Sequence, residues 1–206
     1  MGNNTQKITV SPSIASADQL QLLSELHSAE SRGVSDLHID IEDGNFIPNI
    51  TFGQKTVRAL RGSTDLPFSF HIMATDQLGW LRFASDMNPS IVFGHFEALC
   101  YPRAFTALAR RLHVRCGLAF NPKTSVADAR YLLGEIDGVL LLTVEPDGCG
   151  EGFIDGVLCK ADEIRRAAPG IEIWADGNIT DDRLELLEKH GFTNAVMGRA
   201  FFAKEK

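Results

Sequence analysis

The feature that most constrains the fold is the regular alternation of short β-rich runs with amphipathic helical stretches along all 206 residues. Eight runs are predicted as strands, with the helical stretches between them. These strands are expected at residues 8–14, 36–41, 68–73, 91–95, 115–120, 138–144, 171–176 and 194–199. Dividing 206 residues by eight gives about 26, which is the size of one strand-plus-helix unit.

The architecture follows from the number and pattern of these strands. The run 139–144 is apolar without alternation, as expected for a strand buried on both faces of a parallel sheet. Repeated strand–helix units are compatible with two architectures, an open doubly wound sheet and a closed barrel. The count of eight strands favours the barrel, as does the lack of a GxGxxG motif after the first strand. We therefore predict an α/β fold, a (β/α)8 TIM barrel. One domain over residues 1–206 is expected, because no linker or composition shift divides the chain.

The helical stretches show which side of each helix faces the strands. Residues 17–30 are predicted as a helix with Asp18 in its first turn and a leucine-rich inner side made by Leu20, Leu22, Leu23 and Leu26. Residues 181–189 are predicted as a helix with Gly191 as its C-cap and an inner side made by Leu184, Leu186 and Leu187. Only residues 200–206 follow the last strand, so we expect seven full outer helices and a truncated or missing eighth. An open flank between the first and seventh helices is then the expected subunit contact.

The composition excludes several classes of protein. Lys+Arg 20 against Asp+Glu 27 gives a net charge of -7, which argues against binding to nucleic acid or to anionic membranes. No apolar run approaches the roughly 20 residues of a transmembrane helix, and the first residues lack the pattern of a secretory signal. The four cysteines show no CxxC spacing and are expected to be reduced thiols. We therefore expect a cytoplasmic protein.

Polar residues gather at the predicted strand ends, where TIM barrels carry their chemistry. His38 and Asp40 end the second strand, and their two-residue spacing places both side chains on one face. His71 ends the third strand and Asp176 the seventh. Burying such ionisable groups without partners would cost a free energy of roughly several kcal/mol. Two imidazoles and two carboxylates therefore predict a site for one divalent transition metal, such as zinc, iron, manganese or cobalt.

The remaining histidines have less specific positions. His95 ends the fourth strand, where a contact with a metal ligand, a contact with substrate and a purely structural role are all open. His27, His113 and His190 fall on helices or just before a strand, away from the strand ends, and are expected at the surface.

Six ordered segments carry a resemblance to a known family. SPSIASAD, LHIDIEDGNFIPNITFG, FHIM, GLAFNPKT, EPDGCGEGFI and WADGNI resemble the successive motifs of the ribulose-phosphate 3-epimerases and span nearly the whole chain. The resemblance implies a barrel of the ribulose-phosphate-binding type that interconverts D-ribulose 5-phosphate and D-xylulose 5-phosphate by moving a proton at carbon 3. Members of the family often form homo-oligomers, so a homo-oligomer is expected.

The resemblance also assigns roles to individual residues. It implies that His38, Asp40, His71 and Asp176 are the metal ligands, and that Asp40 and Asp176 are also the acid/base pair. Such a pair, on opposite sides of the substrate, would remove a proton next to a ketone and return one to the other face of the resulting enediolate. The expected substrate-binding residues are Ser13, His71, Met73, Gly148, Gly150, Gly177, Asn178, Gly198 and Arg199.

The phosphate-binding end departs from the family pattern. The family loop NPGFGGQ appears here as residues 145–151, EPDGCGE, which brings three carboxylates near the expected phosphate. At an effective dielectric constant of about 20, a unit charge about 6 Å away contributes roughly 3 kcal/mol. Arg199 stands where the family has serine, positioned either to bind the anion or to pair with a loop carboxylate, and Glu42 stands where a methionine is common. The chain therefore resembles a divergent subgroup whose preferred substrate is another ketose phosphate.

Two other functions compete with the epimerase hypothesis. A catalytically inactive sugar-phosphate-binding barrel with a regulatory role is compatible with the acidic loop, but gives four ligand-type residues no purpose. An indole-pathway isomerase explains the glycine at the eighth strand and leaves His38, Asp40 and His71 without a role. The apolar residues Phe46 and Ile47, followed by Pro48, are expected either in a loop over the site or in a subunit contact.

Overall fold

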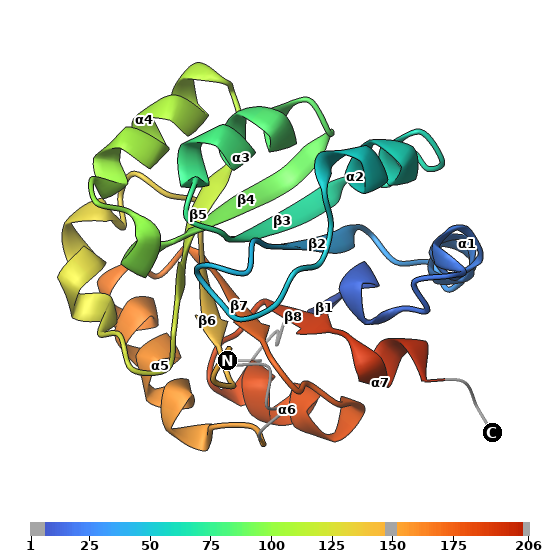
Figure 1. Ribbon diagram of the computed structural model, residues 1–206. Helices are drawn as coiled ribbons and strands as arrows, with labels where there is room; N and C mark the ends of the chain where they lie inside the picture. Colours follow the sequence, from blue (N-terminus) through green and yellow to red (C-terminus); the bar gives the residue numbers. More distant parts are fainter. Residues whose placement is uncertain (1–6, 147–151, 204–206) are drawn as a thin grey trace.

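The computed structural model describes residues 7–146 and 152–203 and contains a ring of eight parallel strands with helices outside it (Figure 1). All eight strands predicted from the sequence are present. They are β1 (Thr9–Pro12), β2 (Leu37–Glu42), β3 (Phe68–Met73), β4 (Pro89–His95), β5 (Cys116–Phe120), β6 (Gly138–Leu142), β7 (Glu172–Asp176) and β8 (Asn194–Met197). Each differs from its predicted range by no more than two residues at either end, because apolar periodicity marks a strand better than it marks a boundary.

The ring is nearly closed, which confirms the predicted (β/α)8 TIM barrel. Hydrogen-bonded neighbours run in the order β1-β8-β7-β6-β5-β4-β3-β2, all parallel. Between β1 and β2 the link is a single parallel bridge, Ser13 with His38, rather than a full ladder. The bridge joins the residue after the carboxyl end of β1 to the second residue of β2, His38, which belongs to the candidate site.

The helices that cover the ring are α1 (Leu22–Ser31), α2 (Gln54–Arg61), α3 (Gln77–Ser85), α4 (Pro102–Arg111), α5 (Leu158–Ala167), α6 (Asp181–Lys189) and α7 (Arg199–Phe202). Helix α6 has the predicted bounds, and Gly191 follows it at φ +78°, as a glycine C-cap requires. The predicted short segment after the last strand is the four-residue α7. No helix in the described part of the chain is long and apolar enough to cross a membrane.

The prediction of seven full outer helices was wrong by one, because the described residues form six α-helices of eight or more residues, α1 to α6. The connection from β5 to β6 contains a 3₁₀-helix, η3 (Val126–Leu132), in place of an α-helix. A 3₁₀-helix rises about 2.0 Å per residue against 1.5 Å for an α-helix, so a short segment can run back along the barrel. The hydroxyl of Ser125 accepts from the Ala127 N–H and starts this segment.

The predicted helix over residues 17–30 was wrong in its first turn. The chain forms a 3₁₀-helix, η1 (Ile14–Ser16), at the end of β1, and α1 begins only at Leu22. Asp18 therefore lies in a turn, where its carboxylate accepts from the Leu20 N–H at 3.0 Å. Leu20 and Leu23 are 96% and 53% exposed, so they are not inner residues, and Leu26 is the leucine that is fully buried.

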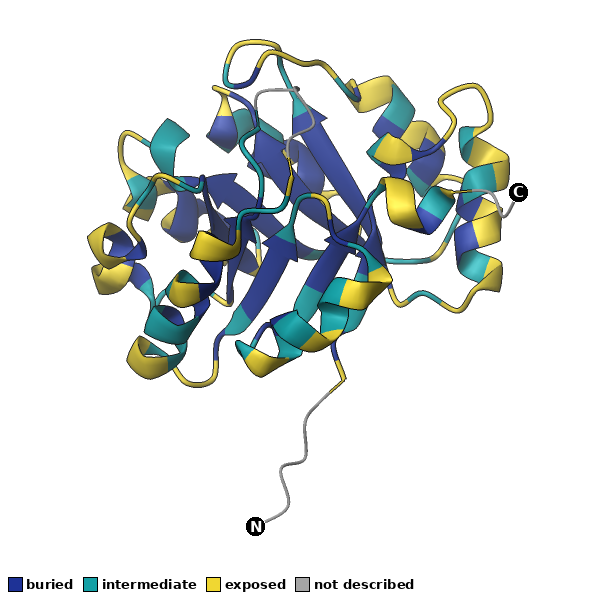
Figure 2. Cartoon of the chain, turned by 90° about the horizontal axis from the view of Figure 1, so that it is seen from below, coloured by how far each residue is buried: buried dark blue, intermediate teal, exposed yellow. Residues whose placement is uncertain are grey.

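Two hydrophobic layers hold the barrel together. A large layer lies between the strands and the helices, so that the strands are buried while exposed residues gather on the outer helices and loops (Figure 2). A second cluster fills the inside of the ring, formed by Ile91, Phe93, Ala119, Leu140, Leu142, Trp174 and Val196. Because side chains alternate along a strand, the next inward positions on β2 and β3 are those of the polar site.

Gly117 on β5 makes room for the inner cluster. A Cβ atom at this position would lie 2.3 Å from Cε1 of Phe93 and 2.6 Å from the carbonyl oxygen of Gly138. We expect Gly117→Ala to lower the free energy of unfolding by about 1–3 kcal/mol, because the ring would have to shift to relieve the overlap. Urea denaturation measures this change. Gly134→Ala is the matched control, since a Cβ there meets nothing within 4 Å, and equal effects of the two substitutions would contradict the packing argument.

Candidate active site and metal centre

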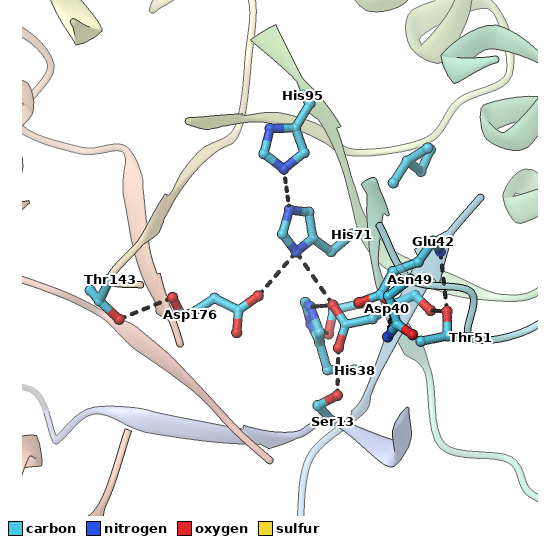
Figure 3. Close-up of polar contacts among 12 residues, drawn as sticks. Ser13, His38, Asp40, Glu42, Asn49, Thr51, His71, His95, Thr143 and Asp176 are labelled. Atoms are coloured by element: carbon cyan, nitrogen blue, oxygen red, sulfur yellow. Dashed lines mark hydrogen bonds and ion pairs between the residues drawn. The ribbon is translucent and has the colours of Figure 1, made fainter. Parts of the chain in front are cut away.

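Four ionisable residues from three strands converge at the carboxyl end of the barrel. His38 and Asp40 come from β2, His71 from β3 and Asp176 from the end of β7 (Figure 3). One ligand atom from each can be chosen so that all four lie within 4.8 Å of one another. His71 Nδ1 lies 3.0 Å from Asp176 Oδ2 and 3.3 Å from Asp40 Oδ1. The parallel register explains the meeting, because Asp40 and His71 are direct partners on neighbouring strands.

The donor atoms of this cluster fit a divalent transition metal. His38 Nε2 and Asp40 Oδ1 are buried without a hydrogen-bond partner among the described residues, and they lie 3.4 Å apart. The other nitrogen of His38, Nδ1, lies 2.9 Å from the hydroxyl of Ser69. Unpartnered buried polar atoms are costly and uncommon in folded proteins. Two nitrogens and two carboxylates aimed at one point are the donors that such a cation prefers.

The charges of this cluster support each other. Burial alone would raise the pKa of Asp40, but His38 and His71 outweigh it and hold the pKa well below the ordinary value. Burial alone would lower the pKa of His71, but the hydrogen bond to Asp176 and the nearby carboxylate of Asp40 raise it to about 9. In the metal-free protein His71 therefore carries a proton on the nitrogen that faces the two carboxylates.

Hydrogen bonds fix the side chain of Asp40 and the backbone at Asp40 and Asp176. The Ser13 hydroxyl donates to Asp40 Oδ2 at 2.5 Å, so Ser13, predicted to contact substrate, also orients Asp40. The Thr51 hydroxyl donates to the backbone carbonyl of Asp40 at 2.5 Å. Thr143, at the end of β6, donates to the carbonyl oxygens of Asp176 at 3.0 Å and Gly177 at 2.5 Å.

Gly177 has a local reason to be glycine. Its φ is +118°, and a Cβ atom there would lie 2.6 Å from Cγ2 of Val144. Asn178 follows at φ 51°, in the left-handed region that asparagine tolerates better than most residues. The turn that follows Asp176 therefore depends on these two residue types.

A cavity of about 350 Å³ opens above the cluster and contains several predicted substrate-binding residues. It is lined by Ser16, Asp40, Glu42, Ile47, Asn49, Met73, Leu142, Val144, Glu145, Pro146, Asp176, Gly177, Asn178 and Arg199. Ser13 and Gly198 line an adjoining hollow that shares Asp40, Asp176 and Arg199 with it. The predicted residues Gly148 and Gly150, like Asp147, lie outside the described residues.

Glu42 adds a third carboxylate to the mouth of the site. It is half-buried, and Asn49 Nδ2 donates to its Oε2 at 2.6 Å. Burial, and then the nearby charges of Asp40 and Asp176, raise the pKa of Glu42 to about 7. Glu42 therefore changes its charge near neutral pH, whereas Arg199 brings a permanent positive charge to the same cavity.

The loop after β2 lies over the site, as one of the two alternatives for its apolar residues predicts. Phe46 packs on the ring of His95, with centroids 4.6 Å apart, and Ile47 is buried and lines the cavity. The carboxylate of Asp43 holds the loop by accepting from the N–H groups of Phe46 at 2.8 Å and Thr75 at 2.7 Å. These contacts place the apolar residues of this loop over the barrel mouth.

The structure also separates the other histidines. His95 is fully buried and bonds to His71 at 2.8 Å between their Nε2 atoms, so it contacts the cluster. His27 and His113 are exposed, as predicted, while His190 is half-buried beside Asp162. The sequence did not predict roles for Ser69, Thr143 and Glu97, because serine, threonine and glutamate are common residue types. The one available signal was the two-residue spacing of His95 and Glu97.

The fold and these residues define a TIM barrel with a candidate divalent-metal centre at its mouth. The ribulose-phosphate 3 epimerase family matches residues 9–202, and this chain belongs to that family. The chain is 33% identical to a ribulose-phosphate 3-epimerase of Bacillus subtilis, over 96% of this chain and 93% of that protein. It is 31% identical to the chloroplastic ribulose-5-phosphate-3-epimerase of Arabidopsis thaliana, over 95% of this chain and 72% of that protein.

Solved structures support the fold at lower identity. The tryptophan synthase α-subunit of Pyrococcus furiosus superposes with a TM-score of 0.70 and 13% identity, covering 96% of this chain and 89% of that one. The E74A variant of the same subunit also gives a TM-score of 0.70, at 14% identity, covering 94% of this chain and 88% of that one. At this identity the likeness shows the shared barrel.

The proton on His71 makes a prediction about metal binding. A cation at this centre must displace that proton, and because the pKa is raised to about 9, the apparent affinity should increase with pH and level off above that value. Below the pKa, each pH unit should change the affinity by up to about tenfold. Competition for Co²⁺ with a chromogenic chelator, from about pH 6.5 to about pH 8.5, measures this. An affinity that stays constant over this range would contradict the proton assignment.

Proposed function

We propose that this chain is a metal-dependent epimerase that inverts carbon 3 of a ketose phosphate, D-ribulose 5-phosphate or a related sugar phosphate. The observation that carries the proposal is the convergence of Asp40 and Asp176 on His71 Nδ1, next to the unpartnered His38 Nε2. Membership of the epimerase family and the relatives named above support it.

The proposed metal is one divalent transition metal, zinc, iron, manganese or cobalt. His38 Nε2, His71 Nδ1 and one oxygen each of Asp40 and Asp176 would hold it. When bound, such a cation stabilises the negative charge that develops on oxygen when a proton leaves the carbon next to a ketone.

The chain's own carboxylates would move the protons. Asp40 and Asp176 come from β2 and β7 and lie on two sides of the His71 ring nitrogen. One carboxylate removes the proton from carbon 3 on one face, and the other, as the acid, returns a proton to the opposite face. Ser13 holds the base Asp40 through the 2.5 Å hydrogen bond, and Thr143 holds the backbone of Asp176. Because the reaction is reversible, the two residues exchange roles with its direction.

The phosphate would bind at the end of the cavity that contains Arg199. Gly177, Asn178 and Arg199 line the cavity, and Gly198 lines the hollow beside it. The guanidinium of Arg199 takes part in no hydrogen bond or ion pair with the described residues, so it is available to a phosphate dianion. Gly148 and Gly150 are proposed to complete this site, and Met73 to line the sugar side.

The acidic residues of the cavity support a substrate other than the usual pentulose phosphate. Glu42 and Glu145 line the cavity where the family pattern has methionine and asparagine. Carboxylates accept hydrogen bonds from hydroxyl groups, so this side of the cavity suits a ketose with a different arrangement or number of hydroxyls. We propose that they select the sugar, whereas Arg199 selects the phosphate.

The biological setting completes the proposal. The chain is proposed to act as one domain, as a homo-oligomer and in the cytoplasm. Cys100, Cys116 and Cys159 are free thiols, which suits a reducing compartment. The inactive regulatory barrel is not favoured, because it gives the buried ligand atoms of His38 and Asp40 no use.

The acid/base assignment predicts the behaviour of two variants. Asp40→Asn and Asp176→Asn should each lower epimerisation by about 10²–10⁴-fold, because each removes one proton-transfer group. Incubation with ketose phosphates in deuterated water, with metal content measured alongside, follows both inversion and label at carbon 3. Asp162→Asn, a surface change beside His190, is the control. If metal-replete wild-type protein labels carbon 3 of no ketose phosphate tested, the proposed function is wrong.

The phosphate assignment predicts a selective change in Arg199→Ser, which restores the family residue. KM for a ketose phosphate should rise by about tenfold, with kcat little changed, because a charge-assisted hydrogen bond to the phosphate is lost. The unphosphorylated sugar is the internal comparison, and its kcat/KM should not change. Equal losses for both sugars would show that Arg199 acts on something other than the phosphate.

A further inference from the structure

His95 is a buried residue of the metal centre that the proposed mechanism leaves without a task. It lies at the end of β4, fully buried, and the centroid of its ring is 4.9 Å from that of His71. Its Nε2 lies 2.8 Å from Nε2 of His71, on the side of that ring away from the two carboxylates (Figure 3). Its Nδ1 lies 3.0 Å from Oε2 of Glu97. A continuous line of hydrogen bonds therefore runs from His71 through His95 to Glu97.

The direction of each bond in this line is determined by its far end. The Glu97 carboxylate already accepts from the Asn121 N–H through Oε1, and its Oε2 faces His95 Nδ1, so His95 Nδ1 donates to it. An imidazole that donates from Nδ1 has its lone pair on Nε2, and a 2.8 Å contact between two ring nitrogens needs one donor and one acceptor. His71 Nε2 is then the donor. A neutral His71 with its proton on Nε2 presents the lone pair of Nδ1 to Asp40 and Asp176.

Glu97 is itself firmly anchored. Its Oε1 accepts from the Asn121 N–H at 2.7 Å, and the Thr124 side chain donates to the same carboxylate. The loop that provides these donors is tied to α5, because Lys160 Nζ donates to the carbonyl oxygens of Asn121 at 3.0 Å, Pro122 at 2.6 Å and Thr124 at 2.7 Å. The line of hydrogen bonds therefore ends on an immobilised carboxylate.

The ring of His95 is also held in place on its other sides. Phe46, from the loop held by Asp43, packs on the His95 ring with centroids 4.6 Å apart. The backbone N–H of His95 donates to Gln77 Oε1 at 3.0 Å. His95 is fully buried and does not line the cavity or the hollow beside it, so its polar contacts within the described chain are those to His71, Glu97 and Gln77.

We propose that His95 and Glu97 are positioning residues that fix the His71 ring in the tautomer and orientation in which Nδ1 is the metal-binding nitrogen. The inference rests on the proposed metal centre and adds to it the residues that determine its affinity. Partners of this kind on a metal-bound histidine typically change metal affinity by about 10–100-fold when they are removed.

The test measures metal binding by the purified protein without substrate. His95→Leu should weaken Co²⁺ binding by about 10–100-fold in competition with a chelator, because His71 loses the acceptor that keeps its proton on Nε2. Glu97→Gln should weaken it in the same range, because an amide can donate as well as accept and no longer requires the proton of His95 to lie on Nδ1. His95→Gln should recover most of the loss, since the amide oxygen of glutamine can accept from His71 Nε2 at about the place of the imidazole nitrogen. The absorption bands of bound Co²⁺ should return toward the wild-type spectrum in the same variant.

The controls separate positioning from general damage. Asp162→Asn removes the partner of His190 Nδ1, a histidine–carboxylate pair at 3.3 Å on the surface, and should bind Co²⁺ as the wild type does. Thermal unfolding of the metal-free proteins identifies any variant that fails to fold, and Glu97→Gln and His95→Gln decide the matter if His95→Leu is one of them.

Two results would overturn the inference. Folded Glu97→Gln protein with wild-type Co²⁺ affinity would show that the line of hydrogen bonds does not act on the metal, and a His95→Gln variant no better than His95→Leu would show that the acceptor is unimportant. Wild-type protein that binds no Co²⁺ would remove the metal centre itself, and with it the proposed function, which distinguishes that failure from the other two.

Discussion

The structure depends on one electrostatic arrangement, the enclosure of two carboxylates and two imidazoles at the mouth of an otherwise apolar barrel. Each of these groups would be costly to bury alone. Together they compensate, because His71 Nδ1 faces both Asp40 and Asp176, and Ser13 and Ser69 bond to the outer atoms of Asp40 and His38. The inner cluster of Phe93, Leu140 and Trp174 lies at alternate inward positions of the same ring and supports these groups.

The register of the parallel strands brings the four ionisable residues together. Asp40 pairs with His71 across β2 and β3, and the bridge of Ser13 to His38 brings β1 to the same level. The loops that follow the strands make further contacts above these residues. Asp43 holds the loop that places Phe46 on His95, while Thr143 holds the turn at Gly177 on the phosphate side. Residues from six of the eight strand ends thus act on one cluster.

The sequence predicted the barrel, its eight strands and the four converging residues, because period, spacing and strand ends are local properties. It did not predict the contacts that cross strands. The spacing of His95 and Glu97 was visible, yet its bond to His71 depends on the register between β3 and β4. The first turn of α1 was also missed, since the leucine pattern at Leu20 and Leu23 imitates an inner face that tertiary packing leaves in solvent. Local patterns cannot show which side of a turn faces water.

The single bridge between β1 and β2 has a consequence for the barrel as a whole. Elsewhere the ring is held by ladders of several backbone hydrogen bonds, whereas at this seam one backbone bridge and the side-chain hydrogen bonds Ser13–Asp40 and Ser11–Asp36 join β1 to β2 and the residue before it. A cation shared by His38 and Asp40 of β2 with Asp176 of β7 would reach across β1 and β8 from one side of the seam to the other. It would then act as a cross-link, so that the ion proposed for chemistry would also determine how firmly the cylinder is closed.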